Sequence, residues 1–169
     1  MPTRPIGRIT FGTPTRASVR RIVNLAALQG LLWGVNTMTI RILLIDEHKP
    51  AREILARRLA AMPGMDVVGS TCDGDQAIRE IEGLNPDVVL IDTKMKQADG
   101  MDICRRALAA DQQTTVAVLT SYLDPNERRL AYEAGVNGYL LKDVDTSNLT
   151  DWIKLAVSND QDDPDDEPE

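Results

Sequence analysis

The 169-residue chain has a formal net charge of −7, with five arginines and no acidic residue in residues 1–39 and seven acidic but no basic residues in residues 158–169. Residues 40–157 are mildly acidic and give no electrostatic reason to expect nucleic-acid binding, which relies on lysine and arginine clusters. The single histidine, His48, argues against a Ser/His/Asp or Cys/His hydrolase, and Cys72 and Cys104 lack metal or disulfide spacing. We interpret both cysteines as buried small hydrophobic residues.

Strand-like and helix-like stretches alternate along residues 40–157. In chain order, apolar runs and helical periodicity predict a strand at 40–46, a helix at 50–62, a strand at 66–70, a helix at 73–84, a strand at 88–91, a helix at 101–110, a strand at 115–120, a helix at 124–135, a strand at 138–141 and a helix at 148–157. For 88–91, periodicity alone leaves a buried helix open. Five βα units predict an α/β fold with a parallel sheet and helices on both faces.

Capping signals are clearest for the helix predicted at 124–135. Asp124 is placed as its N-cap, Pro125 at the first helical position and Glu127 at the reciprocal capping position. Gly135 is the predicted stop signal.

Polar residues follow the predicted strands where a parallel sheet forms its binding edge. Asp46 and Glu47 follow the first strand, Asp92 the third, Thr120 ends the fourth and Lys142 follows the fifth. Clustered carboxylates repel one another, and Mg²⁺ bound by carboxylates, waters and a phosphate relieves the repulsion. A carboxylate beside such a metal can attack phosphorus, while a hydroxyl and an ammonium hold the phosphoryl oxygens.

Each candidate also has an ordinary structural interpretation. Asp92 taken alone could be a turn cap, Thr120 a strand residue and Lys142 a solvated charge at a helix entry. Tyr139 is compatible with a purely core role, and His48 with a solvent-facing position after the acidic pair.

The strings "LLIDEH", "PDVVLIDTKM", "VLTS" and "GYLLKD" together resemble the CheY-like receiver domain of two-component response regulators. "DGDQAI" and the "KD" after the last strand are similar to the NarL/FixJ-like branch, which usually carries a helix-turn-helix effector. The resemblance implies a flavodoxin-like, doubly wound sheet of order 2-1-3-4-5. It assigns roles to Asp92 as phosphoacceptor, Asp46 and Glu47 as the acidic pair around Mg²⁺, the backbone carbonyl of Lys94 as a further metal ligand, Thr120 as switch hydroxyl, Tyr139 as switch aromatic and Lys142 as the phosphate-contacting lysine.

Two positions depart from the family's usual pattern. Glu47 stands where the family more often has Asp, and Mg²⁺ is strict about ligand geometry, so its binding is expected to be weaker or shifted. Lys96 replaces the proline that usually follows the methionine, which loosens the loop and adds a cation. We expect Lys94, Lys96 and Tyr122 to modulate the chemistry at Asp92.

These features predict a stand-alone, cytoplasmic phosphoacceptor protein that is not an enzyme beyond its own phosphorylation and dephosphorylation. The expected partners are a sensor histidine kinase or phosphotransfer protein and an output protein bound by the face formed by residues 125–157. Direct DNA binding is not expected, and a phosphorylation-dependent homodimer is a further expectation. The alternative is a phosphorylation-independent adaptor; a Mg²⁺-dependent phosphatase is disfavoured because Lys94 occupies the position of its second acid.

The expected organisation has three parts. Residues 38–157 form the receiver domain, and residues 158–169 are too acidic and too poor in apolar residues to fold. Residues 1–37 are a basic extension. For this extension three alternatives stay open: an over-extended gene start, a disordered segment, or a translated helix that binds a membrane interface or a partner.

Overall fold

The computed structural model describes residues 39–96 and 98–159. Strands and helices alternate in the order β1 (Ile40–Ile45), α2 (Lys49–Ala60), β2 (Met65–Thr71), α3 (Gly74–Leu84), β3 (Val88–Ile91), α4 (Gly100–Ala110), β4 (Thr115–Thr120), α5 (Pro125–Glu133), β5 (Gly138–Leu141) and α6 (Thr146–Asn159). Each predicted element is present, with shifts of a few residues at some ends. The tail predicted to start at 158 is corrected, because α6 continues to Asn159; the predictions for residues 1–37 and 160–169 lie outside the described residues.

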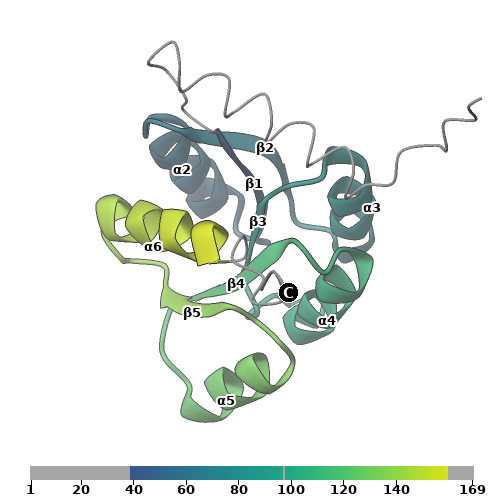
Figure 1. Cartoon of the computed structure of the whole chain (residues 1–169). Coiled ribbons are helices and arrows are strands. Elements are labelled where there is room, and N and C mark those ends of the chain that lie inside the picture. The colour runs from purple at the N-terminus through teal and green to yellow at the C-terminus, as the bar shows by residue number, and fades with distance from the viewer. Residues whose placement is uncertain (1–38, 97, 160–169) are drawn as a thin grey trace, which may run out of the picture. The chain divides into compact units, whose positions relative to one another are not determined.

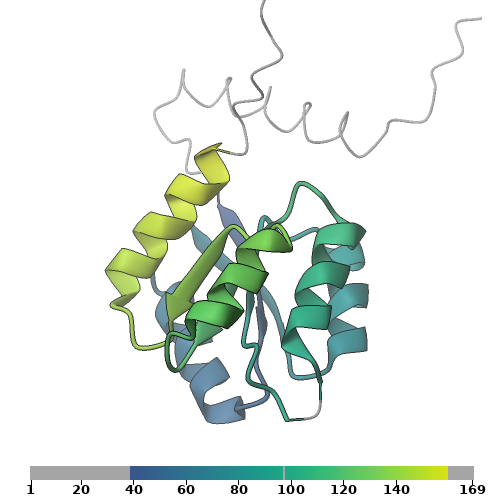
Figure 2. The same ribbon diagram turned by 90° about the horizontal axis from the view of Figure 1, so that it is seen from below.

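The five strands form one parallel sheet of order β2-β1-β3-β4-β5. This is the order 2-1-3-4-5 that the resemblance implied, so the predicted fold is confirmed. Helices α2 and α6 cover one face of the sheet, and α3, α4 and α5 cover the other (Figures 1 and 2). The winding direction changes between β1 and β3, and in open parallel sheets the binding site lies beyond the carboxyl ends of the strands at such a point.

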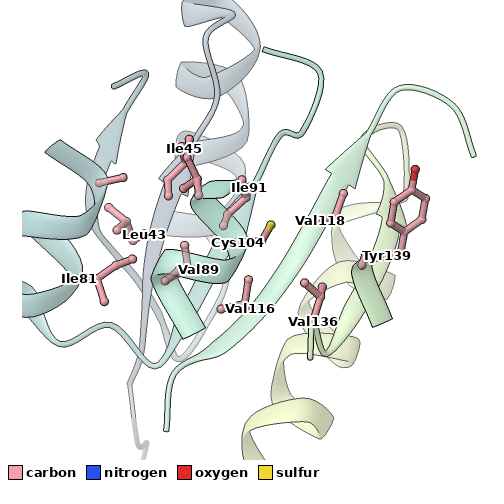
Figure 3. Close-up of a cluster of buried hydrophobic side chains, with 14 residues drawn as sticks. Leu43, Ile45, Ile81, Val89, Ile91, Cys104, Val116, Val118, Val136 and Tyr139 are labelled. Atoms are coloured by element: carbon pink, nitrogen blue, oxygen red, sulfur yellow. The ribbon is translucent and has the colours of Figure 1, made fainter. Parts of the chain in front are cut away.

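Side chains of the central strands alternate between two hydrophobic clusters. In β3, Val89 and Ile91 face the α3, α4 and α5 side, whereas Val88 and Leu90 face the α2 and α6 side. Figure 3 shows the first cluster, in which Tyr139 lies at the opposite end from Ile81. Because all four β3 side chains are buried, the segment reads as a continuous apolar run and is a strand covered on both faces.

Helix α5 begins as the sequence predicted. The Asp124 side chain accepts hydrogen bonds from the backbone N–H groups of Asn126 and Glu127, at 2.9 and 3.2 Å. Gly135 has a φ of +94°, a conformation that favours glycine after a helix. The reciprocal capping role predicted for Glu127 is wrong, because its carboxylate contacts Lys94 and Tyr139 instead.

The two cysteines differ in environment. Cys104 on α4 is fully buried, and burial raises the pKa of its thiol to about 12. Cys72 is exposed, which corrects the prediction, since β2 ends at Thr71 and Cys72 falls in the loop before α3. None of the described helices combines the length and apolar character needed to cross a bilayer.

Candidate functional site

Three charged side chains converge at the carboxyl edge of the sheet. Asp46 follows β1, Asp92 follows β3 and Lys142 follows β5. The Lys142 Nζ lies 2.7 Å from Asp46 Oδ2 and 2.7 Å from Asp92 Oδ2. Asp46 and Asp92 therefore share the Lys142 ammonium group, although they lie 96 and 50 residues before it in the chain.

Backbone hydrogen bonds at the ends of the strands fix these positions. The Asp92 N–H donates to the Ile45 carbonyl, and the Lys142 N–H to the Thr120 carbonyl, both at 2.8 Å. The Asp46 N–H donates to the Thr71 carbonyl at 3.0 Å. The three side chains thus project from backbone that continues the sheet ladder, and such backbone holds a site more firmly than a free loop does.

The second oxygen of each carboxylate binds its own loop. Asp46 Oδ1 accepts the His48 N–H at 2.7 Å, and Asp92 Oδ1 accepts the Lys94 N–H at 2.9 Å. These are the turn contacts typical of aspartate, so Asp92 is both a turn residue and a member of the site. The two interpretations of Asp92 are compatible, because each uses a different oxygen atom.

The cluster keeps Lys142 charged. Asp46 and Asp92 are 7% and 6% exposed, and the Lys142 side chain is 21% exposed. Burial by itself would lower the pKa of Lys142, but the hydrogen bonds and negative charges of Asp46 and Asp92 outweigh it and raise that pKa. Two carboxylates against one ammonium leave an excess negative charge at the edge of the sheet.

The oxygen donors around Asp92 suit a magnesium ion chemically. Mg²⁺ prefers carboxylate, carbonyl and water oxygens and is commonly held by one or two carboxylates plus a phosphate, without an all-protein cage. The Asp46 and Asp92 carboxylates meet at one point, and each oxygen, having two lone pairs, retains accepting capacity. Among the described residues, no group of three or more His, Cys, Asp or Glu side chains is arranged to hold a metal ion. The available donors fit Mg²⁺ as a two-carboxylate site.

Glu47 does not join this pair. Its Oε2 accepts the backbone N–H of Lys96 at 2.6 Å, which connects the segment after β1 to the loop after β3. The predicted third carboxylate is therefore held by the neighbouring loop. Lys96 itself is exposed, and its side chain extends from the same loop four residues after Asp92.

Thr120 ends β4 and is fully buried. Its hydroxyl donates to the backbone carbonyl of Tyr122 at 2.9 Å, while Asp92 takes its hydrogen bonds from Lys94 and Lys142. The Tyr122 ring is exposed, with the Lys94 Nζ 5.2 Å from its centroid. A cation–π contact at this distance ties the loop after β4 to the loop after β3.

A second cluster, made of Lys94, Glu127 and Tyr139, lies beside the first. The Lys94 ammonium forms an ion pair with the Glu127 carboxylate, and the Tyr139 hydroxyl donates to Glu127 Oε2 at 3.0 Å. Burial raises the pKa of Tyr139, and the hydrogen bond and charge of Glu127 raise it further, whereas Thr120 opposes the shift through a side-chain hydrogen bond. The predicted switch residues Thr120 and Tyr139 are thus brought together.

No sequence pattern indicated that Glu127 belongs to this region. Burial alone would raise the pKa of its carboxyl group, but the hydrogen bond from Lys94, followed by further hydrogen bonds and the Lys94 charge, lowers it. The same contact raises the pKa of Lys94. Since 33 residues separate Lys94 from Glu127, no local spacing rule could pair them.

Gly100, the first residue of α4, lies against the backbone of the loop that follows Asp92. A Cβ at this position would lie 2.4 Å from the Thr93 Cα and 2.9 Å from the Asp92 carbonyl oxygen. Only glycine lets the start of α4 approach the loop so closely. Asp99 caps the same helix by accepting the N–H groups of Met101 and Asp102.

Known proteins share both the sequence and the fold of this region. The chain is 36% identical over 117 residues to the transcriptional regulatory protein LiaR of Bacillus subtilis (strain 168), covering 69% of this chain and 56% of LiaR. It is 34% identical over 123 residues to the transcriptional regulatory protein DegU of Brevibacillus brevis, covering 73% of this chain and 52% of DegU. The chain therefore spans about half the length of these curated relatives.

Solved structures of response regulators have the same fold as this region. A LuxR-family two-component response regulator from Aurantimonas sp. SI85-9A1 superposes with a TM-score of 0.67 at 28% identity, covering 72% of this chain and 86% of that one. The signal receiver domain of the putative response regulator NarL from Mycobacterium tuberculosis gives a TM-score of 0.62 at 28% identity, covering 74% and 98%. These relatives confirm the predicted NarL-like resemblance. Because residues 42–154 also match the family described as "Response regulator receiver domain", the chain belongs to the response regulator receiver family.

Proposed function

We propose that Asp92 accepts a phosphoryl group from a phosphohistidine of a sensor histidine kinase or phosphotransfer protein. The observation that carries the proposal is the convergence of Asp46 and Asp92 on Lys142 at the carboxyl edge of the sheet. A carboxylate oxygen of Asp92 attacks phosphorus, a new O–P bond forms, and the N–P bond of the donor breaks. The bonding electrons leave with the imidazole nitrogen, and the product is an acyl phosphate.

The residues around Asp92 favour this step in two ways. Lys142 is positioned to neutralise the charge that collects on the phosphoryl oxygens. The Lys94 N–H holds the other Asp92 oxygen and so fixes the plane of the carboxylate. Asp46, Asp92 and the backbone carbonyl of Lys94 would hold Mg²⁺, with Glu47 turning toward the ion as the resemblance implies. The bound ion would offset the repulsion between the incoming phosphoryl group and the carboxylates.

The proposed switch uses Thr120. Its hydroxyl donates to the Tyr122 carbonyl in the present structure, and a phosphoryl oxygen on Asp92 is a stronger, charged acceptor. We expect Thr120 to exchange the carbonyl for the phosphoryl oxygen. That exchange would withdraw a hydrogen bond from the loop after β4 and change the surroundings of Tyr139, which contacts Thr120 and Glu127.

Intact-mass measurement tests the proposal directly. The protein is incubated with acetyl phosphate and Mg²⁺, and a gain of one phosphoryl group is expected. Asp92→Asn should gain none, whereas Asp151→Asn, at an exposed aspartate on α6, should behave as the unchanged protein. Equal labelling of Asp92→Asn and the unchanged protein would reject Asp92 as the acceptor.

The second candidate is a phosphorylation-independent adaptor. The Glu47 contact with Lys96 favours it, because this contact keeps the expected third carboxylate away from Asp46 and Asp92. An adaptor would bind its partner equally well with Asp92 replaced by Asn. A phosphatase is not supported, because the Lys94 ammonium, at the position of the second acid, is paired with Glu127.

The proposed output face is residues 125–157. It exposes apolar side chains on α5 and α6, including Leu130 at 46%, Tyr132 at 45% and Leu155 at 61%. These side chains lie on the two helices that flank β5 from opposite faces of the sheet (Figure 1), and exposed apolar side chains of this size are what a protein partner would cover. An output protein or a second phosphorylated copy of the chain would bind here, and light scattering before and after phosphorylation distinguishes the homodimer from the monomer.

Three further expectations complete the proposal. The chain would act in the cytoplasm, perform no reaction other than its own phosphorylation and dephosphorylation, and not bind DNA directly through residues 40–157. The acidic composition of residues 40–157 supports the absence of DNA binding by this region. Because the curated relatives are longer and are named as transcriptional regulators, a DNA mobility-shift experiment with the phosphorylated chain is the appropriate test.

A further inference from the structure

The two departures from the family pattern meet in one hydrogen bond. Glu47 Oε2 accepts the backbone N–H of Lys96 at 2.6 Å, across 49 residues of sequence. Glu47 immediately follows Asp46 in the segment before α2, and Lys96 lies four residues after Asp92. The bond therefore joins the two loops that carry the carboxylates of the site.

The bond needs a residue other than proline at position 96 and a glutamate at position 47. A proline at position 96 would have no N–H to donate. At position 47, an aspartate would be one methylene shorter than the glutamate that makes the contact. Each departure considered separately looks like a weakening of the site, whereas together they supply a donor and an acceptor that fit each other.

The same carboxylate is the one expected to turn toward a metal. Mg²⁺ demands nearly octahedral geometry with short, fixed oxygen distances. A Glu47 carboxylate committed to the Lys96 N–H is already oriented by another partner, whereas Asp46 and Asp92 meet at Lys142. The Lys96 N–H and the metal therefore compete for the orientation of Glu47.

We propose that the Glu47–Lys96 bond is a latch that holds the loop after β3 and lowers the affinity of the site for Mg²⁺. Binding of the ion draws Glu47 toward Asp46 and Asp92 and releases the Lys96 N–H. Metal occupancy is thereby coupled to the freedom of the loop that carries Lys94 and Lys96. This inference rests on the magnesium site of the proposed function.

Calorimetric titration with Mg²⁺ tests the latch through a double-mutant cycle. Lys96→Pro removes the donor and is expected to tighten Mg²⁺ binding about three- to tenfold, the range expected for loss of one competing hydrogen bond. In the Glu47→Asp background the shorter side chain does not make the latch, so Lys96→Pro should change the affinity less than twofold. An equal effect in both backgrounds would overturn the proposal, because it would then come from the proline alone.

Lys96→Ala is the matched control for charge. It removes the ammonium but keeps the backbone N–H, so it should change the Mg²⁺ affinity less than twofold. If Lys96→Ala reproduces the whole effect of Lys96→Pro, the side-chain charge and not the latch is responsible. The comparison separates two properties of one residue.

Hydrogen exchange of the Lys96 amide provides a readout that needs no proline variant. In metal-free protein the amide should be protected, and both Glu47→Asp and addition of Mg²⁺ should speed its exchange about three- to tenfold. An exchange rate unchanged by Glu47→Asp, or by saturating Mg²⁺, rejects the latch. Phosphorylation of Asp92 is measured separately, by intact mass, and tests the proposed function. The latch and the phosphoacceptor function can therefore be rejected independently of each other.

Discussion

Two neighbouring clusters use carboxylates in opposite ways. At the edge of the sheet, Asp46 and Asp92 share the single ammonium of Lys142 and leave negative charge uncompensated. Beside it, the one carboxylate of Glu127 receives both the Lys94 ammonium and the Tyr139 hydroxyl. The first cluster can still bind a cation, whereas the second is already satisfied and serves to join three segments of the fold. Both clusters contain carboxylates and a lysine. They differ in charge balance, because only the first has more carboxylates than ammonium groups.

The largest expected effect comes from Lys142→Met. Removing the ammonium leaves two nearly buried carboxylates facing each other without a counter-charge. Breaking a fully buried pair costs about 3–5 kcal/mol, and the partial exposure of Lys142 reduces our expectation to about 2 kcal/mol of unfolding free energy. Urea unfolding of both proteins in chelator-treated buffer measures this loss of unfolding free energy.

Two further variants separate charge from packing at Lys142. Lys154→Met, at an exposed lysine on α6, should change the unfolding free energy by less than about 0.5 kcal/mol. Adding Asp92→Asn to Lys142→Met should recover part of the loss by removing one repelling charge. A double variant as unstable as the sum of the single variants would refute the shared-charge description.

Alkaline pH should remove the stabilisation that the Lys142 ammonium gives to the folded protein. The pKa of Lys142 is raised above its ordinary value of 10.5, so its stabilisation is complete below about pH 10.5 and is lost as the pH rises through the folded-state pKa. The difference in unfolding free energy between the unchanged protein and Lys142→Met should therefore be constant at pH 7–9 and shrink above pH 10.5. Other groups that titrate at alkaline pH, such as tyrosine and cysteine side chains, are present in both proteins, so the difference isolates Lys142. A difference that stays constant to pH 12 contradicts the assignment.

Glu127→Gln tests the second cluster and should have a smaller effect. It keeps the shape of the side chain and an acceptor for Tyr139 but removes the charge that pairs with Lys94. Since Lys94 is 36% exposed, solvent screens the pair and the expected loss is about 1 kcal/mol. The matched control is Glu133→Gln on the same helix, whose exposed pair with Arg129 should contribute about 0.3–0.5 kcal/mol. Equal losses for the two variants would show that Glu127 is an ordinary surface residue.

Tyr139→Phe should have the smallest effect on stability. It deletes the hydroxyl that donates to Glu127 but leaves the buried ring in place, so the expected loss is about 0.5–1 kcal/mol. The same variant should still accept a phosphoryl group at Asp92 in the intact-mass experiment, because the hydroxyl lies in the second cluster. Loss of phosphorylation in Tyr139→Phe would mean that the two clusters are one functional unit.

Sequence patterns located the first cluster because its members are defined by strand ends. Apolar runs stop at Ile45, Ile91 and Leu141, and in a parallel sheet those ends lie at one edge. Asp46, Asp92 and Lys142 were therefore predictable without knowing which atoms touch. The predicted third carboxylate, Glu47, lies at the same edge, but its hydrogen-bond partner could not be found this way.

Local rules failed where a long-range contact competed with a short-range one. Glu127 stands at the capping-box position of α5, and the sequence rule assigned it to its own helix terminus. Its carboxylate instead satisfies Lys94 and Tyr139, from two other segments. The prediction for Cys72 was wrong for a simpler reason, because it relied on residue type alone, whereas Cys72 lies in the loop that follows β2 and is exposed.

The sequence by itself determined the alternation of strands and helices, the parallel sheet and the set of polar residues at its edge, because apolar periodicity and chain order encode them. Only the tertiary structure decided which partners these residues choose: Lys142 for Asp46 and Asp92, Glu127 for Lys94 and Tyr139, and the Lys96 N–H for Glu47. Hydrogen bonds and ion pairs act over about 3 Å between atoms, so residues far apart in the chain become partners only after packing brings them within that distance.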